Sequence, residues 1–238
     1  MLEIKNLTKK YGDQVAVDNL SLTIEDGQIC AFIGHNGAGK TTTLKAVAGI
    51  IDFDDGEILI DKIDIVKHPI LAKKRLAYVP DNPLLYEHLK GIDYLNFICD
   101  IFDIDENFRK NQIEFYAKRL GIFNDLGAVI SSYSHGMKQK LALVSALIHQ
   151  PRLLLLDEPF VGLDPISSHE FKTIMKELSE GGVTIFYSTH VLDVAEKICS
   201  HVAIIKNGKL IAHDTMSAIT SDDSLENIFL ELENEKHD

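Results

Sequence analysis

Two patterns of hydrophobic and polar positions run along this chain. In segments 2–4 and 20–24, apolar residues alternate with polar ones, as in antiparallel strands with one buried face. Other short segments are continuously apolar, at 29–33, 76–79, 153–156, 183–187 and 202–205. Continuously apolar strands that alternate with helices indicate a parallel sheet covered on both faces. The patterns predict an α/β fold with an N-terminal antiparallel β subdomain.

Helical periodicity begins at about residue 92 and continues to about residue 120. Leu95, Ile98 and Phe102 share one face of such a helix. Another helix is expected to begin after Ser134, which can act as its N-cap. We predict a single domain over 1–238, in which 1–87 and 150–218 form the α/β lobe, 88–149 an inserted α-helical subdomain and 219–238 an acidic C-terminal helix.

A glycine-rich segment separates the strand at 29–33 from a stretch of helical spacing. Residues 34–42 match the pattern G-x-x-x-x-G-K-[ST] of a nucleotide-phosphate loop. Glycines let backbone N–H groups close around phosphate oxygens, and the helix that begins near Lys40 adds unpaired N–H groups. Lys40 is expected to reach the β- and γ-phosphates, and the hydroxyl of Thr41 to bind Mg²⁺. The predicted phosphate-binding residues are Gly34, His35, Asn36, Gly37, Ala38, Gly39, Lys40, Thr41 and Thr42.

Two acidic residues follow the leucines at 153–156. Ligands of open α/β sheets bind at the carboxyl ends of the strands, which is where Asp157 and Glu158 would lie. Asp157 can hold Mg²⁺ through its water shell, and Glu158 can act as a general base facing the γ-phosphate. Paired acids after a strand also occur in solvated loops, but the leucines before them and Pro159 after them favour the catalytic interpretation.

Two more candidates, His190 and Tyr11, come from their positions alone. His190 follows the next strand, where an imidazole can contact the γ-phosphate or the attacking water. A histidine standing alone there is more often structural, and the neighbouring elements favour function here. Tyr11 lies at the end of an early strand, where its ring can stack on a purine or simply cover a strand edge. Position leaves both interpretations of Tyr11 open.

The net charge of −12 bears on the partners of the protein, because proteins that bind nucleic-acid backbones normally carry excess positive charge. We therefore expect no nucleic acid as a partner. The three cysteines, Cys30, Cys99 and Cys199, are far apart and fit a reducing cytosol better than a disulfide framework or a zinc site. Every apolar run is shorter than the roughly 20 residues that cross a bilayer. If the protein works at a membrane, another chain is expected to cross it.

The order of these pieces resembles the ATP-binding subunit of an ABC transporter across nearly the whole chain. Residues 34–42 match the Walker A loop, 153–158 the Walker B strand and 162–164 the D-loop of that family. Tyr11 matches its adenine-stacking aromatic, His190 its switch histidine, and Ser134 and Gly136 fall in its signature motif. The resemblance implies a P-loop NTPase fold with a RecA-like parallel core, and ATP and Mg²⁺ as ligands.

The resemblance also implies partners that spacing cannot supply. Two such subunits, identical or different, dimerise head to tail around two ATP molecules. Ser134 and the N–H groups near Gly136 would then cap the γ-phosphate bound by the opposite subunit. ATP hydrolysis would power transport through a separate membrane-spanning permease subunit, with the ATPase in the cytoplasm on the inner face of the cell membrane. Residues 80–89 look more like those of exporters than of importers; a non-transport ABC ATPase and a low-turnover ATP-dependent switch are the alternatives.

The sequence departs from the family pattern in two places. The signature segment 133–137 reads Tyr-Ser-His-Gly-Met where the family usually has Leu-Ser-Gly-Gly-Gln, so His135 replaces a glycine. Asp81 stands where the family usually has the glutamine of its Q-loop, and a carboxylate there would repel phosphate unless Mg²⁺ or a proton lies between them. We expect Asp81 to contact the metal ion. The apolar segment 84–86 either packs on the helical insertion or, as the resemblance implies, receives a coupling helix of the permease.

Overall fold

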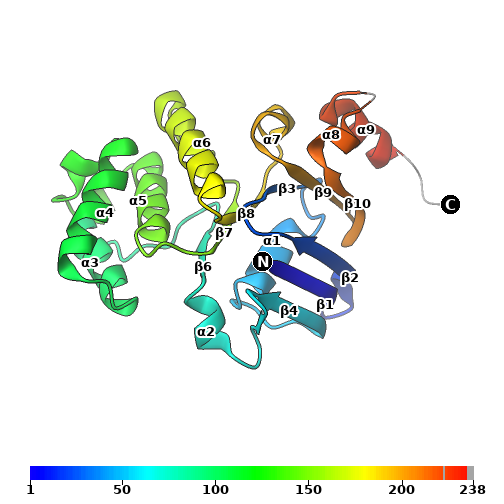
Figure 1. Ribbon diagram of the computed structural model, residues 1–238, viewed down its shortest axis with the longest axis horizontal. Helices are drawn as coiled ribbons and strands as arrows, with labels where there is room; N and C mark the ends of the chain where they lie inside the picture. Colours follow the sequence, from blue (N-terminus) through cyan, green and yellow to red (C-terminus); the bar gives the residue numbers. More distant parts are fainter. Residues whose placement is uncertain (222, 235–238) are drawn as a thin grey trace.

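The computed structural model describes residues 1–221 and 223–234 (Figure 1). The larger of its two sheets has the strand order β10-β9-β3-β8-β7-β6, and among these strands only β10 pairs in the antiparallel sense. The strands are β3 (Ile29–Ile33), β6 (Leu76–Val79), β7 (Leu153–Asp157), β8 (Thr184–Ser188), β9 (His201–Lys206) and β10 (Lys209–Thr215). The predicted parallel sheet is confirmed. The edge strand β10 was not predicted, because it is half exposed and lacks a clear hydrophobic pattern.

The smaller sheet is antiparallel, with the strand order β2-β1-β4-β5. Leu2 lies opposite both Ile24 and Ile60, and all three side chains are buried. The alternation seen in the sequence arises because one face of this sheet packs on the core while the other meets solvent. Its strands are β1 (Leu2–Tyr11), β2 (Gln14–Ile24), β4 (Asp55–Ile60) and β5 (Ile63–Asp64). The predicted N-terminal antiparallel subdomain is confirmed.

Successive residues of the central strands face opposite sides of the larger sheet. Leu154 and Leu156 belong to a buried cluster on one face, and Leu153 and Leu155 to a second cluster on the other face. The second cluster also contains residues of α1 (Lys40–Val47) and of the antiparallel sheet. Helix α1 is therefore packed in the core shared by the two sheets. The first cluster is covered by α5 (His135–Leu147), α6 (Pro165–Glu180) and α7 (Leu192–Ile198).

The inserted helices gather at one end of the molecule, as Figure 1 shows: α3 (Gly91–Ile101), α4 (Glu106–Arg119) and α5. The pattern predicts helical periodicity from 92 to 120, whereas the structure interrupts it after α3. Asp103 adopts a left-handed φ of 55°, and the side chain of Asp105 caps α4 by accepting hydrogen bonds from the N–H groups of Asn107 and Phe108. Local polar residues thus end one helix and begin the next.

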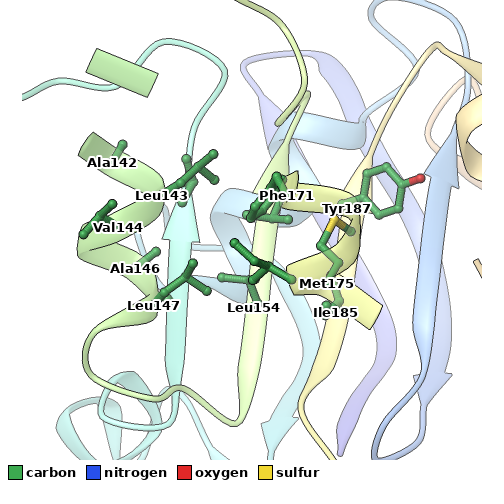
Figure 2. Packing of buried hydrophobic residues seen from close by; sticks show 14 of the residues in the cluster. Ala142, Leu143, Val144, Ala146, Leu147, Leu154, Phe171, Met175, Ile185 and Tyr187 are labelled. Atoms are coloured by element: carbon green, nitrogen blue, oxygen red, sulfur yellow. The ribbon is translucent and has the colours of Figure 1, made fainter. Parts of the chain in front are cut away.

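Helix α5 attaches the inserted helices to the central sheet. Figure 2 shows Leu147 of α5 on one side of Leu154, with Phe171 and Met175 of α6 on the other side. No more than 1% of the surface of any of these four side chains is exposed. Close packing of this kind holds α5 against the central strands.

Short elements complete the chain. They are α2 (Pro69–Lys73), the 3₁₀ turns Phe123–Asp125 and Ile130–Ser132, α8 (Met216–Ile219) and α9 (Leu225–Asn234). Within the segment predicted as an acidic C-terminal helix, α9 begins after Ser224, whose hydroxyl accepts a hydrogen bond from the N–H of Asn227. Residues 235–238 of that predicted helix lie outside the described residues. Among the helices of the described ranges, none is long and apolar enough to cross a membrane.

Candidate active site

The glycine-rich loop follows β3 directly and ends where α1 begins at Lys40. Gly39 has a left-handed φ of 111°, and a Cβ added there would lie 2.5 Å from the carbonyl oxygen of Ala16. Only glycine fits that conformation and that space without a shift. The ammonium of Lys40 donates hydrogen bonds to the carbonyl oxygens of Gly34, at 2.6 Å, and His35, at 3.1 Å. The side chain of Lys40 thus lies along the loop that is predicted to bind phosphate.

The loop, Tyr11 and the acidic residues line one hollow of about 350 Å³. It brings together Tyr11 from the end of β1, Thr41 and Thr42 from α1, Asp81 after β6, and Asp157 and Glu158 at the end of β7. Of the loop itself, Asn36, Gly37, Gly39 and Lys40 line this hollow, whereas Gly34 and His35 line its neighbour. Ala38 is buried beneath the loop.

The side chain of Asp157 lies almost completely buried at the floor of this hollow, with 2% of its surface exposed. Its Oδ1 accepts a hydrogen bond of 2.5 Å from the hydroxyl of Ser188 on the neighbouring strand. Its Oδ2 is buried and has no hydrogen-bond partner among the described residues. An unsatisfied buried carboxylate oxygen is costly, so a ligand that binds this oxygen would stabilise the site.

The donor set fits a magnesium ion better than a metal held by protein alone. Thr41 supplies a hydroxyl and Asp157 an open carboxylate oxygen, both in the same hollow. Within the described residues there is no cluster of three or more His, Cys, Asp or Glu that could hold a metal. Mg²⁺ usually takes one or two protein oxygens and completes its shell with water and substrate phosphates.

Glu158 and His190 lie together at a second hollow of about 610 Å³, which adjoins the first and shares Asn36, Asp81 and Glu158 with it. Nδ1 of His190 is 2.9 Å from Oε2 of Glu158. The backbone of Glu158 is left-handed, with φ of 49°, and its N–H donates to Ser188. Such a conformation is costly for a residue with a Cβ and is often found at functional sites. The predicted acid and histidine are thus brought together.

Of the signature residues, Ser134 and Gly136 line neither hollow of their own chain. Ser134 is exposed at the N-terminus of α5, where its hydroxyl accepts a hydrogen bond of 3.3 Å from the N–H of Met137. A Cβ on Gly136 would lie 2.5 Å from the carbonyl oxygen of Gly162, so the D-loop packs closely over the start of α5. His135, which packs on Gly162, lines the second hollow. Within one chain, Ser134 and Gly136 do not meet the phosphate loop.

Several residues that line the two hollows, among them Gln14, Asn82, His135, Thr189 and Phe229, were not predicted from the sequence as ligand-binding or catalytic. His135 and Thr189 line the second hollow together with Phe229 of α9. Thr189 is adjacent to His190, which is a signal in the sequence, and its hydroxyl accepts a hydrogen bond of 3.0 Å from the N–H of Val191. Phe229 lies far along the chain from every motif, and nothing in the sequence indicates it.

Tyr78 of β6 adds a buried polar group near the acidic residues. Its hydroxyl has no hydrogen-bond partner among the described residues. Burial, and after it the negative charges of Asp157 and Asp81, raise the pKa of Tyr78 well above its usual value. The phenol therefore stays protonated and remains a hydrogen-bond donor.

The comparison with known proteins places this geometry in one family. The model of the ABC transporter family matches residues 17–161, more than half of the chain. The ABC-type transporter ATP-binding protein EcsA of Bacillus subtilis strain 168 is 31% identical over 240 residues, which cover 99% of this chain and 97% of EcsA. The bacitracin transport ATP-binding protein BcrA of Bacillus licheniformis is 36% identical over 212 residues, which cover 89% of this chain and 68% of BcrA.

Solved structures agree with the sequence relatives. An ATP-binding subunit of an ABC transporter superposes with a TM-score of 0.94 at 31% identity, over 98% of this chain and 100% of that one. The fold is also that of the dimeric cassette MJ0796 bound to ADP and phosphate, with a TM-score of 0.83 at 22% identity, over 91% of this chain and 99% of that one. The chain therefore belongs to the ABC transporter family, as one of its ATP-binding, ATP-hydrolysing subunits.

Proposed function

We propose that this protein hydrolyses ATP to power the export of a substrate through a separate membrane-spanning permease subunit. The proposal depends on one observation, which is that three features of the site lie together at two adjoining hollows. These are the phosphate loop, the unpartnered buried oxygen of Asp157 and the contact between Glu158 and His190. A relative named for linearmycin resistance supports the outward direction, since removing a toxic compound is a direct route to resistance.

ATP would bind with its phosphates on the loop. The N–H groups of the loop and of the first turn of α1 surround the phosphate oxygens, and Lys40 exchanges its carbonyl partners for the β- and γ-phosphates. Tyr11, half exposed at the edge of the same hollow, would stack on the adenine. Thr41 and Asp157 would hold Mg²⁺, which would supply positive charge to the phosphates when bound. Asp81 adds a second carboxylate to that side of the site.

Glu158 would act as the general base. A water oxygen bonds to the γ-phosphorus while Glu158 accepts its proton, and the bond from the γ-phosphorus to the β–γ bridging oxygen breaks to release ADP and phosphate. Such positioned proton transfer contributes typically ~10²- to 10⁴-fold. His190, whose Nδ1 lies 2.9 Å from Oε2 of Glu158, would orient the carboxylate and contact the γ-phosphate. A pure binding switch has no use for this pair, so the contact favours turnover.

A second subunit would complete each site. Ser134 stands exposed at the N-terminus of α5, and a helix N-terminus is a favourable place for an anion. We propose that two subunits, identical or different, associate head to tail so that Ser134 and the N–H groups near Gly136 meet the γ-phosphate held by the partner. Neither Ser134 nor Gly136 lines a hollow of its own chain, which fits this arrangement.

The permease contact would lie at the loop after β6. Leu84 exposes 93% of its surface and Tyr86 exposes 52%, although both are apolar or aromatic. Tyr86 is in ring contact with Tyr94 and Phe97 of α3, so the loop is continuous with the inserted helices. Exposed apolar groups in this number indicate a docking surface. We propose that it receives a helix of the permease and holds the protein at the inner, cytoplasmic face of the cell membrane.

Two experiments test the proposal. With Glu158→Gln, which binds ATP without supplying a base, Mg-ATP should convert the protein to a dimer in light scattering. Glu180→Gln, a change of the same chemistry at an exposed acid on α6, should not trap a dimer. A Glu158→Gln protein that stays monomeric would contradict the head-to-tail arrangement. Purification from membranes should also recover a protein with several spans, and Leu84→Asp should abolish that recovery; recovery of ribosomes instead would favour a non-transport ATPase.

A further inference from the structure

Helix α9 packs against α7, the helix that follows the His190 loop. Leu225, the first residue of α9, has none of its surface exposed, and its N–H donates a hydrogen bond of 3.2 Å to the carboxylate of Glu196 on α7. A carboxylate at a helix N-terminus is a favourable pairing. The two helices are therefore joined both by burial and by a polar contact.

A residue of α9, Phe229, also reaches the second hollow. It lines the second hollow together with Leu192 and His190, and both Phe229 and Leu192 pack against the same buried cluster. Leu192 is the first residue of α7 and follows His190 by two positions. An aromatic side chain from α9 thus borders the same hollow as the His190 loop and packs on the same buried cluster as the first residue of α7.

Helix α7 has little structure of its own to fix that loop. It spans Leu192–Ile198, and its N-cap Val191 makes no capping hydrogen bond through its side chain. Helices this short are marginal without tertiary packing. The imidazole of His190 is itself mostly exposed, at 61%, and is held on its inner side by Glu158. Locally the loop is ordered by the hydrogen bond from the N–H of Val191 to Thr189, and packing from neighbouring elements contributes the rest of its position.

We infer that Phe229 is a positioning residue, which holds α7 and the His190 loop so that the imidazole stays beside Glu158. The inference rests on the catalytic role proposed for His190. It assigns α9 a part in hydrolysis, although α9 contributes no polar group to the reaction. Loss of the Phe229 ring should leave the phosphate loop intact and release the His190 loop.

The first test measures order directly and needs no turnover. In hydrogen exchange on the full chain, the amides of residues 191–195 should exchange at least about 10-fold faster in Phe229→Ala than in the wild type. Leu230→Ala, which removes a half-exposed side chain from the next position of the same helix, is the matched control and should exchange like the wild type. If the truncated variant folds poorly, Phe229→Leu should give an intermediate rate. Equal exchange in the Phe229 and Leu230 variants would overturn the inference.

The second test separates this inference from the role of His190. Phe229→Ala should lower kcat for ATP about 5-fold with KM unchanged, and should have no further effect on a His190→Ala background. An equal loss on both backgrounds would mean a general structural effect and would overturn the inference. Full turnover by His190→Ala would instead overturn the proposed role of the histidine, and the exchange measurement would still decide whether Phe229 orders the loop.

Discussion

Arg119 and Glu177 form a two-pronged ion pair between the inserted helix α4 and the core helix α6. Nη1 and Nη2 of the arginine lie 2.5 Å and 3.0 Å from the two carboxylate oxygens. Nε of Arg119 also donates a hydrogen bond of 2.5 Å to Glu170. The hydrogen bonds to Arg119 lower the pKa of Glu177, and those to the two glutamates raise the pKa of Arg119. Paired, planar contacts of this kind fix orientation as well as distance.

Replacing Arg119 should weaken the attachment of the inserted helices. Glu177 is half exposed, so solvent screens part of the interaction, and Arg119→Met should lower the free energy of unfolding by about 1–2 kcal/mol. Lys118→Met removes a neighbouring, exposed pair with Glu114 on α4 and should cost no more than about 0.5 kcal/mol. Urea unfolding of both variants checks the difference. Equal losses in the free energy of unfolding would show that the two-pronged ion pair stabilises the fold no more than the exposed pair does.

His149 should make stability depend on pH. It stacks on Phe102, with ring centroids 3.8 Å apart, and burial lowers its pKa from 6.5 to about 4. The folded state therefore disfavours the imidazolium, and below pH 6.5 the unfolded state binds more protons. The free energy of unfolding should be insensitive to this group above pH 6.5 and should fall by up to about 3 kcal/mol as the pH drops towards 4.

The His149→Leu variant isolates this contribution. Its urea unfolding between pH 4 and 6.5 should show a shallower dependence on pH than that of the wild type. His169→Leu, at an exposed position of α6, should keep the full dependence. A wild-type slope in His149→Leu would mean that other groups cause the acid instability.

Ser188 should support metal binding through Asp157. Ser188→Ala removes the only hydrogen bond to Asp157 Oδ1 that the described residues provide, leaving the buried carboxylate unsatisfied. We expect about 1–3 kcal/mol lower stability and about 10-fold weaker binding of Mg-ATP, since partners of metal ligands commonly have such effects. Tyr78→Phe, which removes a buried hydroxyl with no partner among the described residues, should be neutral or stabilising. Calorimetric titration and thermal unfolding measure both; unchanged Mg-ATP affinity in Ser188→Ala would contradict the role of Asp157.

Asp81 should weaken the binding of ATP when Mg²⁺ is absent and strengthen it when Mg²⁺ is present. Its carboxylate lines both hollows, so without Mg²⁺ it opposes phosphate binding, whereas with Mg²⁺ it contributes to the charge that holds the ion. Asp81→Asn should tighten binding of ATP in EDTA and weaken binding of Mg-ATP, each by about 5-fold, which corresponds to about 1 kcal/mol. Fluorescence titrations with and without Mg²⁺ check the sign. Parallel shifts in both conditions would show that Asp81 does not contact the metal shell.

Local signals in the sequence account for much of the fold and of the site. The glycine-rich loop, the cap at Ser134 and the apolar strands depend on nearby residues and could be predicted. The contact of Glu158 with His190 could not, because it depends on the register in which β7 and β8 pair, with Asp157 opposite Ser188. The break between α3 and α4 at Asp103 could not be predicted either, because helical spacing continues on both sides of it. Phe229 approaches the site only through tertiary packing, which no spacing rule contains.

The alternation of Leu153–Leu156 between two buried clusters also bears on how the protein unfolds. Each central strand contributes to the cores on both of its faces, so neither core can melt while the other keeps its strands. Slipping a strand by a single position would exchange the two sets of side chains, which makes intermediate pairings unfavourable. Chemical denaturation followed by circular dichroism and by tyrosine fluorescence should therefore give coincident, single transitions for the sheet and the parts packed on it.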